Sequence, residues 1–156
     1  MRVTLCVVGR LRGGPEADLI SDYVSRFVRP VRALGRGPLA SAEVEDRKGG
    51  GMTAEAALLR RAVPKGAVLC CLDERGTVET SPAFARRLAG WRDAGRGDVA
   101  FVIGGADGID PDLRAHADHL LSFGAMVWPH MLVRVMLTEQ LYRAASILAG
   151  GPYHRS

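Results

Sequence analysis

The glycine-rich stretch FVIGGADGID (residues 101–110) is the part of the sequence best suited to hold a ligand. Three apolar residues lead there into Gly104, Gly105 and Gly108. This transition is typical of the end of a buried strand in an α/β protein, where ligands commonly bind. Glycines also let the backbone approach a flat molecule closely. The stretch is therefore a candidate nucleotide or cofactor site, with a purely structural turn as the alternative.

The spacing of these glycines does not match the common phosphate-binding motifs. The dinucleotide fingerprint is G-x-G-x-x-G after a first strand, whereas G-G-x-x-G follows a late strand here. A second glycine-containing stretch, SFGAMVWPHMLVR (residues 122–134), closes another apolar run at Pro129, and His130 then precedes a helix carrying Arg134 and Arg143. Backbone groups at two such strand ends can bind the edges of an adenine without any phosphate, as S-adenosylmethionine requires.

Apolar runs alternate with amphipathic segments along the chain, and this predicts the elements that position both stretches. The alternation indicates one α/β domain over residues 1–156, with a mainly parallel sheet flanked by helices. Strands are predicted at 3–9, 39–45, 67–73 (ending in Asp73 and a turn at 74–76), 99–105 and 120–128. Helices are predicted at 15–28, 54–63 (opened by Thr53), 83–95 (capped by Ser81-Pro82), 112–119 (capped by Asp110-Pro111) and 131–150. Residues 46–53, DRKGGGMT, are expected to form a surface loop or a mobile flap.

Composition indicates a soluble globular protein. Of the 156 residues, 47% are hydrophobic, and the apolar runs are far shorter than the roughly 20 residues that cross a bilayer. The N-terminus MRVTLCVVGR resembles a first strand rather than a signal peptide, so a cytoplasmic location is expected. Cys6, Cys70 and Cys71 are predicted to be small buried hydrophobes, because they lack disulfide-framework or zinc spacing.

The charge balance is mildly basic and is dominated by arginine. The net charge is +4, and all basic residues except Lys48 and Lys65 are arginine. Arginine binds phosphate bidentately and stacks on bases, so this composition suits a nucleic-acid partner without requiring one.

Four stretches together resemble one family closely. FVIGGADGI, LDERG, PHMLVRVMLTEQLYRAASIL and the terminal PYHRS are similar to the RlmH family of SPOUT methyltransferases, over essentially the whole chain. These enzymes methylate N3 of a pseudouridine in the helix 69 loop of 23S ribosomal RNA. The resemblance implies a SPOUT-type fold with a C-terminal trefoil knot, a homodimer with each site near the subunit interface, and S-adenosylmethionine as cofactor.

The resemblance also assigns residues to the site. The implied cofactor-binding residues are Leu72, Gly104, Phe123, Gly124, Ala125, Met126, Val127 and Trp128. Two positions depart from the family pattern: Ala106 replaces a proline in the glycine turn, and Met131 stands where His-Pro is usual. A less rigid turn that keeps its backbone groups is expected from Ala106.

Methylation of a ring nitrogen needs alignment of donor and acceptor and help for the departing N3 proton, but no metal. The resemblance makes His154, Tyr153 and Arg143 the catalytic candidates: His154 as base or orienting residue, Tyr153 stacking on a base, and Arg143 facing the RNA. A frayed terminus and a simple Arg143–Glu139 ion pair are the alternatives. Arg134 has the same ambiguity, and His130 either lies beside the cofactor or binds a backbone carbonyl.

Two other functions compete with the methyltransferase. The first is a non-catalytic ribosome- or RNA-binding module with a degenerate cofactor pocket. The second is a small oxidoreductase that uses a nicotinamide cofactor, although the misplaced glycine pattern argues against it.

Overall fold

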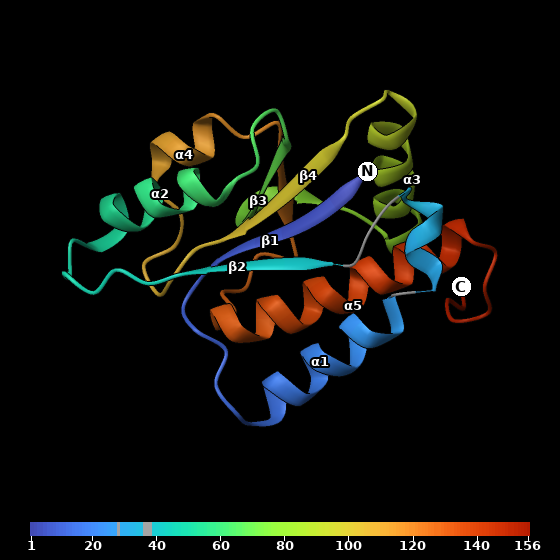
Figure 1. Ribbon diagram of the computed structural model, residues 1–156, viewed down its shortest axis with the longest axis horizontal. Coiled ribbons are helices and arrows are strands. Elements are labelled where there is room, and N and C mark those ends of the chain that lie inside the picture. Colours follow the sequence, from blue (N-terminus) through green and yellow to red (C-terminus); the bar gives the residue numbers. More distant parts are fainter. Residues whose placement is uncertain (28, 36–38) are drawn as a thin grey trace.

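Five strands form one parallel sheet in the order β2-β1-β4-β3-β5. The computed structural model describes residues 1–27, 29–35 and 39–156 (Figure 1). The strands are β1 (Arg2–Val8), β2 (Ala40–Val44), β3 (Val68–Val78), β4 (Asp98–Ile103) and β5 (His119–Ser122). The predicted single-domain α/β architecture is confirmed.

Helices cover both faces of the sheet. One face carries α1 (Pro15–Phe27), the short 3-10 helix η1 (Pro30–Ala33), α3 (Ser81–Asp93) and α5 (His130–Leu148); the other carries α2 (Gly51–Ala62) and α4 (Pro111–Ala115). Helix α5 packs against α1, α3 and η1, and Figure 1 shows α1 and α5 side by side. Because helices cover both faces of the sheet, the central strand β4 has to be apolar on both sides.

The side chains of β4 explain why that strand reads as a continuous apolar run. Phe101 and Ile103 belong to the core under α1, α3 and α5, whereas Ala100 and Val102 belong to the core under α2 and α4. Larger residues thus face the layer of long helices, and smaller ones face the layer of α2 and α4. The predicted burial of all three cysteines is confirmed, and burial raises the pKa of Cys6 to about 11.

Several predicted boundaries are wrong for local reasons. The turn expected at 74–76 lies inside β3, where the pairing with β5 shifts between Leu72 and Thr77. The strand expected at 120–128 ends at Ser122, because Gly124 adopts a left-handed φ of 116°. Residues 123–128 are therefore a loop.

Two helix starts also differ from the prediction. Helix α2 begins at Gly51, inside the segment expected to be a loop or flap. Helix α3 is capped by Thr80 instead of Ser81, since the Thr80 hydroxyl accepts a hydrogen bond from the backbone N–H of Ala83. The Asp110 cap of α4 is confirmed. Val28, the last residue of the first predicted helix, lies outside the described residues.

Within the described part of the chain, none of the helices is long and apolar enough to span a membrane. The trefoil knot implied by the resemblance stays a prediction.

Candidate cofactor site and C-terminal cluster

A cavity of about 320 Å³ lies at the carboxyl ends of β4 and β5 and beside the middle of β3, and we call it the strand-end cavity. Its volume falls within the range of small-molecule sites, about 300–1,000 Å³. Seven of the eight predicted cofactor residues line it; Ala125 does not. The lining residues are Leu72, Asp73, Glu74, Ile103, Gly104, Gly105, Ala106, Asp107, Gly108, Ile109, Leu121, Phe123, Gly124, Met126, Val127, Trp128, His130 and Val133.

The glycine turn forms a wall of this cavity from backbone. The N–H of Gly108 donates to the carbonyl of Gly105 at 3.0 Å, and Gly108 has a left-handed φ of 83°. A Cβ on Gly104 would lie 2.6 Å from the carbonyl oxygen of Gly108. Only glycine fits at that position without a backbone shift. The turn keeps its hydrogen bond with Ala106 in place of the proline usual in the resembling family.

Helix α2 packs against the glycine turn through Glu55. A carboxylate oxygen of Glu55 lies 2.7 Å from the position that a Cβ on Gly105 would take. Burial raises the pKa of Glu55, and the nearby carboxylates of Asp107 and Asp46 raise it further. The turn is therefore enclosed between the cavity and a packed helix.

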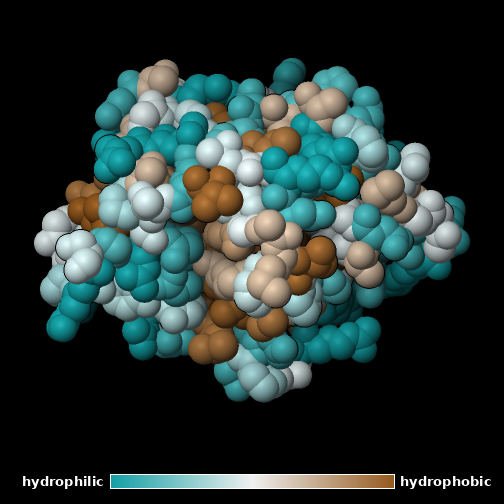
Figure 2. Space-filling view, turned by 180° about the vertical axis from the view of Figure 1, so that it is seen from behind, coloured by the Kyte–Doolittle hydropathy of each residue, from teal (hydrophilic) through white to brown (hydrophobic). Residues whose placement is uncertain are grey.

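The loop 123–128 forms another wall. The Ser122 hydroxyl accepts a hydrogen bond from the N–H of Gly124 at 3.0 Å, which fixes the exit from β5. Because these residues lie beyond the paired part of β5, the sheet does not use their backbone groups. Residues Met126, Val127 and Trp128 are 74%, 81% and 42% exposed. Figure 2 shows apolar side chains gathered along the middle of the face opposite that of Figure 1.

Sequence reasoning missed two acidic residues of the cavity. Glu74 and Asp107 both line it, as does Asp73, which had been noted only as a strand end. Both missed residues directly follow positions already singled out, so their adjacency was the available signal. His130 also lines the cavity.

Two of the three catalytic candidates, Arg143 and Tyr153, bind Glu139, and His154 joins them through Arg143; we call these four residues the C-terminal cluster. One Glu139 carboxylate oxygen accepts from the Arg143 Nε at 2.9 Å and from the Tyr153 hydroxyl at 3.0 Å. The Arg143 guanidinium lies 4.7 Å from the centre of the Tyr153 ring, and its Nη1 lies 3.2 Å from the Nδ1 of His154. The expected i,i+4 pair therefore exists and also holds the tail.

The remaining ambiguous arginine has a structural position. Arg134 is 3% exposed, and its Nη1 lies 3.0 Å from a carboxylate oxygen of Glu43 on β2. A guanidinium that is buried and already paired with a carboxylate is not available to RNA phosphate. The alternative in which Arg134 faces the RNA is therefore wrong.

The strand-end cavity and the C-terminal cluster use different parts of α5. His130 and Val133, at the start of the helix, line the cavity, whereas Glu139 and Arg143 follow further along it. At about 1.5 Å of rise per residue, His130 and Arg143 are separated by about 20 Å along the helix axis. None of the four residues of the C-terminal cluster lines the strand-end cavity of its own chain.

Comparison with known proteins decides the family. A family model described as "Predicted SPOUT methyltransferase" matches residues 1–154. The Ribosomal RNA large subunit methyltransferase H of Roseobacter denitrificans is 72% identical over 156 residues, covering 100% of both chains. This chain belongs to the RlmH family of SPOUT methyltransferases. The RlmH protein of Dinoroseobacter shibae is likewise 72% identical, over 99% of each chain. A probable methylase family protein from Haemophilus influenzae shares the fold, with a TM-score of 0.54, 12% identity and coverage of 99% of this chain and 70% of that one.

SPOUT methyltransferases use S-adenosylmethionine, and the strand-end cavity fits that molecule. No lysine or arginine is among the lining residues, whereas Asp73, Glu74 and Asp107 are. A lining of backbone and carboxylates suits a ligand that carries a positive sulfonium and no phosphate. It does not suit the pyrophosphate of a nicotinamide dinucleotide, so the oxidoreductase alternative is set aside. Among the described residues, no group of His, Cys, Asp and Glu is placed to hold a metal ion.

Proposed function

We propose that this RlmH-family enzyme methylates N3 of a pseudouridine in the helix 69 loop of 23S ribosomal RNA, acting in the bacterial cytoplasm. The observation that carries the proposal is the strand-end cavity, which is lined by the glycine turn, apolar residues and carboxylates, with no lysine or arginine among the lining residues. The names of the 72% identical relatives support ribosomal RNA as the substrate class.

Each part of the cavity has a role in this proposal. Leu72, Gly104 and the loop 123–128 would hold S-adenosylmethionine, which supplies an activated methyl group on its sulfonium. The residues of the chain exclude water and fix the approach of the acceptor nitrogen, because orientation accounts for much of the acceleration of such a displacement.

The C-terminal cluster supplies the groups that recognise the base. Tyr153 offers a ring for stacking, and Arg143 keeps that ring in place from one side while Glu139 binds its hydroxyl. Arginine has no acceptor, so in this contact the Nδ1 of His154 accepts the hydrogen bond from Arg143, which leaves Nε2 as the donor of the ring. This supports an orienting role for His154, as a donor to a ring carbonyl, over the role of general base.

The separation of the two regions supports a homodimer. Because no residue of the C-terminal cluster lines the cavity of its own chain, the tail is proposed to act on the cavity of a second copy. The exposed apolar side chains of Met126, Val127 and Trp128, next to the cavity, support an interface there. Sedimentation equilibrium should give twice the chain mass, and a monomer that retains full activity would contradict this arrangement.

The decisive experiment is mass spectrometry of helix 69 from a strain that lacks the gene. The pseudouridine should lose one methyl group, and the purified protein with S-adenosylmethionine should restore it on ribosomes. An unchanged mass would refute the substrate assignment. Calorimetric titration with S-adenosylmethionine separates the enzyme from the RNA-binding module, because the module would give no heat of binding.

A further inference from the structure

The strand β3 contains an irregularity directly after Leu72. Both Leu72 and Thr77 pair with Leu121 of β5, so residues 73–76 leave the ladder. A bulge of this kind leaves backbone groups without sheet partners, and other groups have to hold its shape. The bulge lies at the wall of the strand-end cavity, because Asp73 and Glu74 line it.

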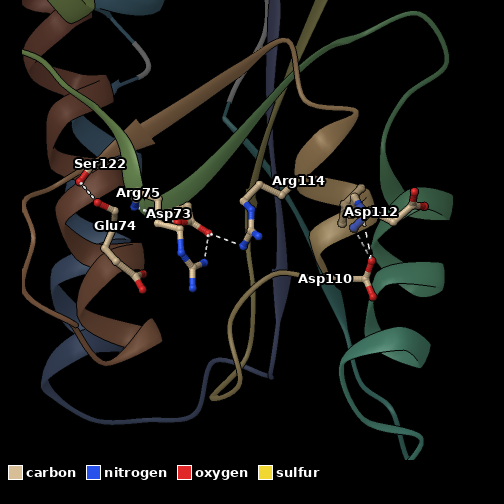
Figure 3. Close-up of polar contacts among 8 residues, drawn as sticks. Asp73, Glu74, Arg75, Asp110, Asp112, Arg114 and Ser122 are labelled. Carbon is tan, nitrogen blue, oxygen red and sulfur yellow. Dashed lines mark hydrogen bonds and ion pairs between the residues drawn. The ribbon is translucent and has the colours of Figure 1, made fainter.

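The carboxylate of Asp73 holds the bulge from inside. Its side chain is 4% exposed, and its Oδ1 accepts from the backbone N–H of Arg75 at 2.8 Å. Its Oδ2 accepts from the Nη1 of Arg114 at 3.3 Å and lies 3.6 Å from the Nη1 of Arg75 (Figure 3). Arg114 is 23% exposed, against 64% for Arg75, so Arg114 is the more firmly held charge partner. A buried carboxylate that loses such a partner is strongly disfavoured.

The contacts of the bulge reach the other two walls of the cavity. Arg114 belongs to α4, the helix that begins directly after the glycine turn and is capped by Asp110. The hydroxyl of Ser122 lies 3.2 Å from the carbonyl oxygen of Glu74 and binds the N–H of Gly124, where the loop 123–128 starts. Figure 3 shows Ser122 of β5 and Arg114 of α4 on opposite sides of the bulge, reaching Glu74 and Asp73 respectively.

We propose that Asp73 and Arg114 form a positioning pair that sets the spacing of the three cavity walls for S-adenosylmethionine. Arg114 does not line the cavity, so it acts through Asp73. The pair fixes the bulge after Leu72 against the helix that follows the glycine turn. This inference rests on the proposed function, in which the strand-end cavity holds the methyl donor.

The substitution Arg114→Met tests the pair, with calorimetric titration of S-adenosylmethionine as the readout. We expect Kd to rise at least about tenfold while turnover at saturating S-adenosylmethionine stays within about twofold, because the pair orders the binding walls and not the transferring groups. Arg114→Lys keeps the charge and should recover part of the affinity. The matched control is Arg60→Met: Arg60 also pairs with α4, through Asp112, but both side chains are exposed (44% and 68%). Arg60→Met should leave Kd unchanged.

A double substitution shows whether Arg114 acts through Asp73. Asp73→Asn with Arg114→Met should bind S-adenosylmethionine more tightly than Arg114→Met alone, because no unpaired carboxylate remains in the wall. Equal Kd values for Arg114→Met and the unaltered protein would overturn the proposal. So would a Kd of the double variant that equals the product of the fold-changes caused by Asp73→Asn and Arg114→Met separately. Failure of the unaltered protein to bind S-adenosylmethionine would instead overturn the proposed function.

Discussion

The strand-end cavity and the C-terminal cluster are built by different means. The shape of the cavity depends on backbone conformation: a glycine turn, a loop beyond the end of β5 and a bulge in β3. Side chains form the cluster, through a single carboxylate, that of Glu139, which holds both Arg143 and Tyr153. A backbone wall depends on the space available to each residue, whereas a side-chain cluster depends on charge and protonation. Substitutions in the cavity should therefore change cofactor affinity, whereas substitutions in the C-terminal cluster should change turnover.

Removal of the tail gives the largest expected effect. Deletion of residues 152–156 takes away Tyr153 and His154 but leaves the cavity intact. Methylation of ribosomes should fall by at least about 100-fold, the scale of a lost positioned catalytic group. The Kd for S-adenosylmethionine, measured by calorimetry, should stay within about twofold of the full-length value. Unchanged turnover would remove the tail from the mechanism.

Adding a side chain to the glycine turn should weaken cofactor binding, which the tail deletion leaves unchanged. In Gly104→Ala the new Cβ would meet the Gly108 carbonyl oxygen at 2.6 Å, so the turn has to move. Such overpacking typically costs about 1–3 kcal/mol, which, where it falls on the cofactor-binding conformation, predicts a Kd for S-adenosylmethionine raised about 5- to 150-fold. Gly90→Ala is the control: it lies within α3 with nothing within 4 Å of a new Cβ, and should only stabilise the protein. Equal affinities for both variants would refute the close-packed turn.

Neutralising the centre of the cluster should have a smaller effect. Glu139→Gln removes the charge that Arg143 and Tyr153 share, while its amide oxygen still accepts one hydrogen bond. Turnover should fall about tenfold with cofactor affinity unchanged, and amide exchange of residues 150–156 should accelerate. Asp22→Asn offers a comparison, because Asp22 forms an exposed i,i+4 pair with Arg26. Slower tail exchange in Glu139→Gln would contradict the anchoring role.

The smallest effect concerns the Tyr153 phenol. Burial, followed by hydrogen bonds to Tyr23 and Glu139, raises the pKa of Tyr153 well above its ordinary value. In the unfolded chain the Tyr153 phenol loses its proton at pH about 10, whereas in the folded chain it keeps the proton at that pH. The contribution of Tyr153 to the free energy of unfolding is therefore complete below pH about 10 and declines above it. Stability measured against pH should fall more steeply for the unaltered protein than for Tyr153→Phe. Identical slopes would contradict the shift.

The sequence predicted the layers well because the strand interiors and helix faces carry a strong periodic signal. Phe101, Ala100 and their neighbours in β4 are apolar because helices cover both sides of that strand. The glycine turn was also evident, since Gly104 and Gly108 are needed for close backbone approach and a left-handed φ.

What the sequence did not predict depends on contacts between distant residues. The strand expected to run through Trp128 ends at Ser122, where an apolar loop lines the cavity and looks like a strand by composition alone. The bulge after Leu72 is held by Arg114, which lies 41 residues beyond Asp73 in the sequence. The residues around Leu72 give no indication of that partner. The catalytic roles assigned to the tail came from the family resemblance and stay predictions.

Helix α5 runs without interruption from His130, at the cavity, to the turn that carries Arg143, and Arg134 ties its first turns to β2. The length of α5 therefore sets the distance between the strand-end cavity and the C-terminal cluster. One residue inserted near its middle would advance everything beyond by about 1.5 Å and rotate it by about 100°. The C-terminal cluster would then be shifted and rotated relative to the strand-end cavity and the sheet, so the length of α5 should tolerate change less well than the surface loops.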